Sequence, residues 1–204
     1  MSKLKQAPEV NAGSMADIAF LLLIFFLVTA SIETDVGLNR ILPRESTDPY
    51  VEIKARNLLE IGINAKNQLM VEGDILPLEE LRTKVVSFID NGGLQTDDKD
   101  FCGYCKGERL AHLSEHPDQA IISITTSRES DYAYYVSVQN EIIGAYNLLR
   151  NRESSRLYGI AYETLVQNYG EDIGPTEKMA IKGKIEGIRT MFPQKIIEPE
   201  VIHQ

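Results

Sequence analysis

The longest apolar run of the chain lies near its start. Residues 18–32, IAFLLLIFFLVTASI, contain no charged side chain. With the small residues from Gly13 onward, the run reaches roughly the 20 residues that a helix needs to cross a bilayer core of about 30 Å. The pattern predicts a transmembrane helix over residues 13–32, after a short tail over residues 1–12. Asp17 is the one charged residue inside this helix.

A second pattern, alternating apolar and polar positions, marks the start of one compact domain over residues 58–204. Leu59, Ile61 and Ile63 alternate with polar or small residues, which is typical of a half-buried strand. A second short strand is predicted over residues 69–72. Both strands belong to a small mixed β-sheet.

Two helices are predicted to cover this sheet. The first begins at Pro77 and carries apolar positions at helical spacing as far as Ile89. The isoleucine-rich residues 120–126 then indicate a central strand buried on both faces. Ser130 is expected to cap the second helix. The stripe of that helix consists of Tyr132, Tyr135, Val136, Ile142, Ile143, Tyr146 and Leu149.

The carboxyl-terminal part adds further helix. Its composition stays helical from Glu153 to about Val166, breaks at Gly170 and Gly174, and restarts at Pro175. We expect the apolar stripe of this last helix at Ile181, Ile185, Ile188 and Phe192. A final strand is expected at residues 195–197. The predicted fold class is α+β: one N-terminal transmembrane helix, a small mixed β-sheet covered by two helices, and an extra C-terminal helical section.

Residues 33–57 are predicted to be a linker that carries one edge strand. The positions that define this strand are Val36, Leu38, Leu42 and Pro43. Proline cannot donate a hydrogen bond to a sheet ladder, so such a strand belongs at an edge. An open edge can pair with a partner's strand, and an ordinary edge strand is the alternative interpretation.

Composition narrows the classes of function. Lys and Arg total 21 against 30 for Asp and Glu, a formal net charge of -9. This balance argues against binding nucleic acid and offers no basic patch for anionic lipid. Neither a phosphate-cradling glycine motif nor a nucleophile signature is present, so we expect no enzyme active site and no cofactor.

The charges that flank the apolar run predict its orientation. Lys3 and Lys5 leave the amino-terminal flank positive, which keeps it in the cytoplasm and exports the following domain. The alternative is a cleaved signal peptide with a cleavage site at residues 28–30. Asp17, at the start of the apolar stretch, argues against cleavage.

Asp17 is the first candidate for chemistry. A carboxyl group surrounded by hydrocarbon is costly when charged, so small rearrangements around it can load and release a proton. The alternative is an acid that caps its own helix at the membrane surface. On an ideal helix Asp17 shares its face with Phe20, Leu21, Ile24 and Val28, and Ser14 lies near the edge of this face. We expect these residues to face a membrane partner.

The segment MADIAFLLLIFFLVTAS, followed by Leu42-Pro43, resembles the single-pass subunits of the ExbD/TolR family. In that family the acid lies at the start of the span, which is the place of Asp17. Two prolines common in the family are replaced here by Ser14 and Ser31. The ending MFPQKIIEPE is similar to versions from Bacteroidetes-type bacteria. The resemblance fails over an insertion from Leu94 to about Asp118.

The resemblance implies a function for the complex. An ExbB/TolQ-type multi-helix protein would enclose two copies of this chain, and proton flow past Asp17 would energise TonB-dependent transport across the outer membrane. The edge strand would bind a TonB-like transducer or the twin copy. The alternative processes that such a complex would energise are envelope maintenance of the TolR kind and a gliding-type motor. A rival class is a passive, membrane-anchored periplasmic binding protein in which Asp17 only fixes helix pairing.

The motif Cys102-Gly103-Tyr104-Cys105 lies in the insertion and is followed by His112 and His116. Together they offer ligand types for zinc, but the gap between the pairs is shorter than the usual finger loop. In an exported domain a local disulfide between Cys102 and Cys105 is favoured over metal. Thioredoxin-like redox chemistry fits less well, because the pair does not start a helix after a strand.

Overall fold

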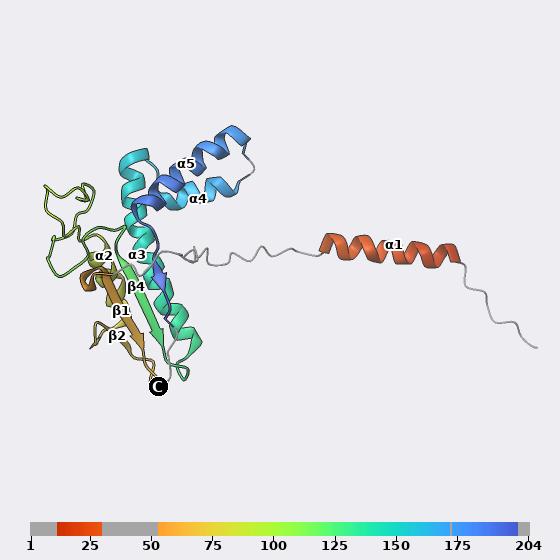
Figure 1. The fold of residues 1–204 in the computed structure, drawn as a ribbon. Helices are drawn as coiled ribbons and strands as arrows, with labels where there is room; N and C mark the ends of the chain where they lie inside the picture. The colour runs from red at the N-terminus through yellow and green to blue at the C-terminus, as the bar shows by residue number, and fades with distance from the viewer. Residues whose placement is uncertain (1–11, 30–52, 172, 200–204) are drawn as a thin grey trace, which may run out of the picture. The chain divides into compact units, whose positions relative to one another are not determined.

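The computed structural model describes residues 12–29, 53–171 and 173–199 (Figure 1). In the first of these ranges, side chains are described only for residues 12–26. The chain divides into two compact units, residues 1–40 and residues 41–204. The first unit contains the helix α1 (Ala12–Thr29). The second contains the sheet and the remaining described helices.

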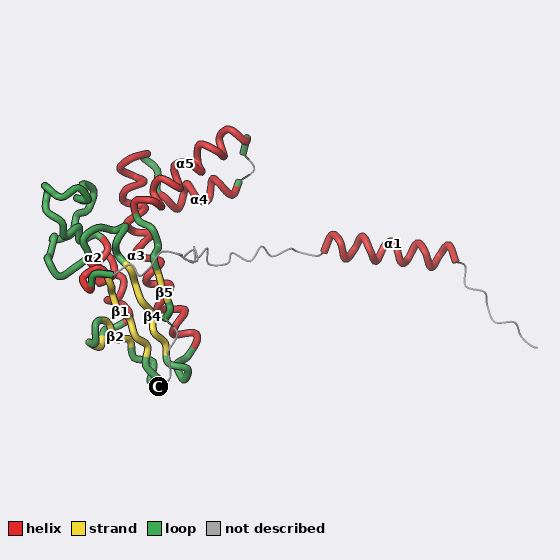
Figure 2. The backbone as a smooth tube through the Cα atoms, in the orientation of Figure 1, coloured by secondary structure: helices red, strands yellow, loops and turns green. Residues whose placement is uncertain are grey.

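The second unit is built on a mixed five-stranded sheet, yellow in Figure 2. In sheet order β3-β2-β1-β4-β5 the strands are β3 (Asp74–Ile75), β2 (Leu69–Val71), β1 (Leu58–Ile63), β4 (Ile121–Thr126) and β5 (Ile196–Ile197). β2 pairs antiparallel with β1 on one side and with β3 on the other. β4 pairs parallel with β1 and with β5. The predicted α+β class and the mixed sheet are confirmed.

One face of the sheet carries the main core. Alternation along β1 buries Leu59, Ile61 and Ile63 beneath two helices, α2 (Leu78–Ile89) and α3 (Tyr132–Tyr158). In register, Ile61 lies opposite Val71 of β2 and Ile124 of β4. The helices contribute Leu81, Val85, Phe88, Ile142, Tyr146 and Leu149. The predicted arrangement of two helices on the sheet is confirmed.

The helix starts differ from expectation. Pro77 is the N-cap of α2 and not its first helical residue. Asp131 caps α3, its carboxylate accepting a hydrogen bond from Ala133 N at 3.0 Å. The hydroxyl of Ser130 instead donates to Ser127 O at 2.7 Å. Tyr132 is 76% exposed, so its assignment to the stripe is wrong, because the buried positions of α3 begin only at Val138.

The predictions for the strands need two corrections. β4 lies between β1 and β5 and is buried on both faces at Ile122, Ser123 and Ile124, but this burial does not extend to Thr125, which is exposed. The second strand ends at Val71, and after a two-residue turn the chain returns as β3, which the sequence pattern did not predict. The final strand, β5, is confirmed within residues 195–197.

The carboxyl-terminal helices form a smaller second core. α4 (Tyr162–Gly170) and α5 (Pro175–Met191) lie side by side, away from the sheet (Figure 1). Their buried residues are Tyr162, Leu165, Ile181, Ile185 and Ile188. The breaks after Gly170 and before Pro175 are confirmed. The stretch from Glu153 to about Val166, expected to be helical from its composition, is divided between α3 and α4. Gly159 ends α3 with a φ of 70°, the left-handed backbone that favours glycine.

Candidate functional site

Asp17 lies in the second turn of α1 and is the only charged residue of that helix. Helical spacing places Leu21 and Ile24 on the same side of the helix as Asp17, with Ser14 and Phe20 at the two borders of that side. Val28 belongs to α1, but its side chain lies outside the described residues.

Every described side chain of α1, from residue 12 to residue 26, is exposed. Phe20, Leu21 and Ile24 are 62%, 53% and 38% exposed. A helix that is apolar on all sides needs lipid or protein to cover it. Among the described residues, no helix combines the length and the mean hydropathy that identify a membrane span.

The predicted edge strand, with Val36, Leu38, Leu42 and Pro43, lies outside the described residues. The sheet edges that the structure does describe are β3 and β5. Each has only two residues, and Ile75 of β3 is 65% exposed.

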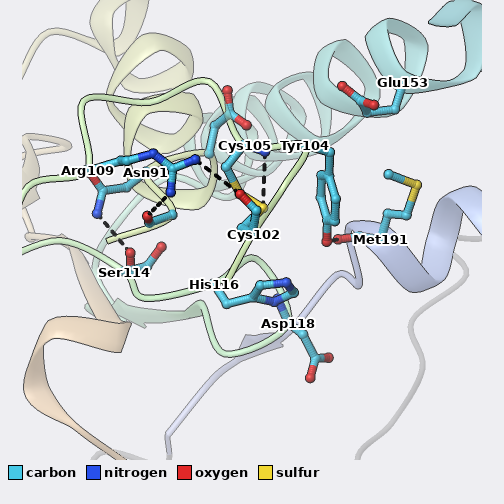
Figure 3. Close-up of a disulfide and its surroundings, with 12 residues drawn as sticks. Asn91, Cys102, Tyr104, Cys105, Arg109, Ser114, His116, Asp118, Glu153 and Met191 are labelled. Carbon is cyan, nitrogen blue, oxygen red and sulfur yellow. Dashed lines mark hydrogen bonds between the residues drawn. A yellow bond between two sulfur atoms is a disulfide. The ribbon is translucent and has the colours of Figure 1, made fainter. Parts of the chain in front are cut away.

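The insertion, residues 94–118, contains no helix or strand and is organised around a disulfide between Cys102 and Cys105, the favoured alternative for this motif (Figure 3). The two Cα atoms are 5.5 Å apart, and Cys102 is completely buried. Because both sulfurs are bonded to each other, neither is a thiolate ligand for zinc. The described residues include no cluster of three or more metal-ligating side chains.

The disulfide lies against the carboxyl end of α2. Gly92 has a φ of +59°, and a Cβ built on it would be 2.7 Å from Cys105 Cβ, so the approach requires glycine. Arg109 donates to Gly92 O at 2.9 Å and to Cys102 O at 3.1 Å, joining the two segments. Asn91, fully buried, donates to Leu110 O and Ser114 O and accepts from Leu110 N.

The insertion also binds the segment that precedes β1, through the carboxylate of Glu115. Glu115 is 5% exposed and accepts hydrogen bonds from Lys54 at 2.9 Å and from Asn57 at 3.2 Å. Arg56 pairs with the same carboxylate at 3.4 Å and donates to Leu113 O at 3.0 Å. Burial alone would raise the pKa of Glu115, but these hydrogen bonds and the two cations outweigh it and hold the pKa below 4.5.

Tyr104, between the two cysteines, connects the insertion to the end of α5. Its hydroxyl donates to Met191 O at 2.8 Å (Figure 3). Its ring lies edge-on to the rings of Phe192 and His116. Burial, together with the carboxylates of Asp118, Glu153 and Asp90, raises the pKa of Tyr104 to about 12. Burial also disfavours the charged form of His116 and so lowers its pKa. Its Nδ1 accepts a hydrogen bond from Asp118 N at 3.0 Å. His112 is exposed.

A partly buried ion-pair network connects the C-cap of α2 with α3 beside this contact. Arg152 makes two hydrogen bonds to Asp90, at 2.5 and 2.8 Å, and one to Glu153 at 3.0 Å. Glu153 is completely buried and also accepts from Arg156 at 2.6 Å. Arg152 further donates to Tyr104 O at 3.3 Å, so the network and the disulfide loop share a partner.

A hollow of about 330 Å³ lies between β4, the start of α3 and the segment after β5. Its lining includes Thr126, Ser127, Ser130, Tyr132, Tyr135 and Glu198. Tyr135 donates to Glu198, and Gln139 donates to the same carboxylate at 3.0 Å. The Glu198 carboxylate is therefore occupied by neighbouring side chains.

Sequence reasoning missed the residues that hold the insertion in place. Glu115, Tyr104 and Arg152 contact residues that are 58 to 87 positions away, so no local spacing points to them. The one local signal is the Asn91-Gly92-Gly93 sequence, which is typical of the end of a helix. Its glycines also allow the insertion to approach closely.

Comparisons with known proteins bear on residues in both units. No curated protein matches the chain. The family model described as biopolymer transport protein ExbD/TolR matches residues 3–146, well over half of the chain. This match includes Asp17, the sheet strands β1 to β4 and the insertion, and it ends within α3. The chain therefore belongs to the ExbD/TolR family of biopolymer transport proteins.

Proposed function

We propose that this chain is the proton-coupling subunit of an ExbB–ExbD-type complex in the inner membrane, where it energises TonB-dependent transport across the outer membrane. The observation that carries the proposal is the position of Asp17. It is the only charged residue in α1, a helix whose described side chains are all exposed and mostly apolar. Membership of a biopolymer transport family supports the same role.

The chemistry follows from the surroundings of that carboxyl group. Once an apolar partner covers α1, the charged form of Asp17 is disfavoured, and hydroxyls or water supplied by the partner make proton release possible. Ser14 lies one turn before Asp17 and adds a hydroxyl of this chain. A proton that moves through about 100 mV releases about 2.3 kcal/mol, which is enough to bias a rotation or a binding step.

The proposed topology places residues 13–32 across the membrane, with the amino terminus in the cytoplasm and the second unit in the periplasm. The uncharged run from residue 18 to residue 32 and the flanking Lys3 and Lys5 support this orientation. A mature protein that retains Met1 or Ser2 would agree with it. Removal of the first thirty or so residues by a signal peptidase would exclude it.

The proposed partners follow from the family. An ExbB/TolQ-type multi-helix protein covers α1 on the side of Asp17, Phe20, Leu21 and Ile24, with two copies of this chain inside it. The segment from Val36 to Pro43 binds a TonB-like transducer or the second copy by strand pairing. Purification in mild detergent tests both partners at once.

The test of proton coupling compares three variants of the full chain in the co-purified complex. Asp17→Asn keeps the shape and removes titration, Asp17→Glu keeps titration, and Glu79→Gln removes an exposed acid of α2 as the matched control. We expect Asp17→Asn to abolish proton uptake into liposomes and outer-membrane transport while the complex stays assembled. Glu79→Gln should leave both unchanged, and Asp17→Glu should retain a measurable fraction.

Full proton uptake and transport by an assembled Asp17→Asn complex would refute the proton-coupling role. That result would favour the passive anchored binding protein, in which Asp17 only orients helix pairing. Loss of assembly in Asp17→Asn, with wild-type proton uptake by the fraction that remains assembled, would refute it equally.

A further inference from the structure

The two sulfurs of the disulfide have different surroundings. Cys102 is completely buried and Cys105 is 8% exposed. Cys102 Sγ accepts a hydrogen bond from the backbone N–H of Cys105 at 3.1 Å. The guanidinium of Arg109, held over the Phe101 ring at 4.4 Å, donates to Cys102 O at 3.1 Å.

This asymmetry fixes the direction in which a thiolate can open the bond. In thiol–disulfide exchange the attacked sulfur must be accessible, and the departing sulfur leaves faster when its thiolate is stabilised. Cys105 satisfies the first requirement better than Cys102. Cys102 satisfies the second, because the backbone N–H of Cys105 already points at its sulfur and the guanidinium of Arg109 is bound to its main-chain oxygen.

We propose that Cys102–Cys105 is a thiol–disulfide exchange site, reduced in the folded protein by a dithiol that attacks Cys105, and that its reduction loosens the attachment of the insertion to α5. The nucleophile is one thiolate of the dithiol. It forms a bond to Cys105 Sγ, and the Cys102–Cys105 bond breaks with its electron pair leaving on Cys102. The second thiolate then displaces Cys105, so the dithiol becomes a disulfide, and the two cysteine thiolates take up two protons.

The consequence for the fold arises from the residue between the cysteines. Tyr104 belongs to the four-residue loop that the disulfide closes, and its hydroxyl binds Met191 O at the end of α5. Its backbone oxygen accepts from Arg152 of α3. Opening the loop restores backbone freedom to Gly103 and Tyr104, so both contacts lose their fixed geometry.

The same loop restrains the end of α2. Cys105 lies against Gly92, and Gly107 donates to Asp90 O at 2.9 Å. Gly93 donates to Ser114 O at 2.9 Å. The backbone amides of Gly93 and Gly107 therefore report on whether the insertion remains attached to the end of α2. The amide of Phe192, which donates to Ile188 O at 3.2 Å, reports on the end of α5 that Tyr104 holds.

The site of attack is tested with two single-cysteine variants of the full chain in mild detergent. Cys102→Ser leaves the thiol of Cys105, and Cys105→Ser leaves the thiol of Cys102. At a pH high enough to ionise both thiols, where the stabilised thiolate of Cys102 has no advantage in ionisation, the more accessible Cys105 should react with an aromatic disulfide reagent at least about tenfold faster than Cys102. Equal rates, or faster reaction of Cys102, would overturn the assignment.

The structural consequence is tested on the wild-type chain, so no variant has to fold. Dithiothreitol is added, the thiols are counted by alkylation and mass, and amide hydrogen exchange is measured before and after. We expect two alkylated cysteines and at least about tenfold faster exchange at Gly93, Gly107 and Phe192, with the amides of β1 unchanged. A Cys102→Ala/Cys105→Ala chain serves as the control and should not respond to dithiothreitol.

Two results would contradict the proposal. One is a disulfide that resists dithiothreitol until the whole second unit unfolds, seen as alkylation that appears only together with exchange throughout β1. The other is complete reduction with unchanged exchange at Phe192. Neither measurement uses proton transport, so the outcome is independent of the role proposed for Asp17.

Discussion

Tyr104 donates its phenolic hydrogen bond to the main-chain oxygen of Met191 at 2.8 Å, across 87 positions of the chain. Through this contact the insertion, which has no regular secondary structure, holds the end of α5. Phe192, fully buried in the main core, lies against the same ring. The smaller core of α4 and α5 is thus joined to the main core at a point that the insertion stabilises.

Replacing Tyr104 with Phe should make the stability of the second unit less sensitive to alkaline pH. Burial raises the pKa of Tyr104, and of Tyr146, to about 12, whereas both ionise near 10 in the unfolded chain. Between these values the unfolded state binds fewer protons, so the free energy of unfolding falls as pH rises. Denaturant titrations from pH 8 to pH 12 should show a smaller fall in Tyr104→Phe than in the wild type.

At pH 8 the same variant should lose about 1 kcal/mol of unfolding free energy, because the hydrogen bond to Met191 is absent while the ring remains. Tyr132→Phe is the control, since Tyr132 is 76% exposed and should change stability by less than about 0.5 kcal/mol. Equal alkaline profiles for wild type and Tyr104→Phe would contradict the assignment.

Glu115→Gln should detach the start of the second unit from the insertion. The variant removes the charge that pairs with Lys54 and Arg56, and we expect a loss of about 1 to 3 kcal/mol near pH 7. Because the folded pKa of Glu115 lies below its ordinary 4.5, this stabilisation is present above pH 4.5 and is lost as pH falls through the folded value. The difference between wild type and Glu115→Gln should therefore shrink in acid-unfolding curves below pH 4.5.

Arg152→Ala should be among the most destabilising single substitutions of a charged residue in α3. It leaves the carboxylates of Asp90 and Glu153 buried without their shared cation, which costs about 3 kcal/mol or more. Lys182→Ala breaks a surface pair with Glu186 at 3.7 Å and should cost less than about 0.5 kcal/mol. Chemical denaturation of both variants checks the contrast, and similar losses would argue against it.

Gly92→Ala and Gly103→Ala form a matched pair beside the disulfide. At Gly92 the new Cβ would meet Cys105 Cβ at 2.7 Å in a left-handed backbone, so we expect a loss of about 1 to 3 kcal/mol. At Gly103 no heavy atom lies within 4 Å, and the change should be nearly neutral. Thermal unfolding under oxidising conditions measures both, and a neutral Gly92→Ala would show that the insertion is not held closely there.

Local sequence determined the elements of this protein. Alternation along β1, helical spacing in α2, and the breaks at Gly170 and Pro175 depend only on residues a few positions apart, so they are readable without a fold. The unusual position of Asp17 within an apolar run was visible in the same way. The end of α3 at Gly159 was missed, because an isolated glycine is tolerated within many helices.

Tertiary structure alone decided which elements are joined and by which side chains. Nothing in the spacing of Glu115, Tyr104 or Arg152 shows that they meet Lys54, Met191 and Asp90, because sheet order and the path of the insertion bring these residues together. The same holds for exposure: the first turn of α3 extends past the core and leaves Tyr132 in solvent. Periodicity reflects the geometry of one segment, whereas contacts between distant residues follow from how the segments pack.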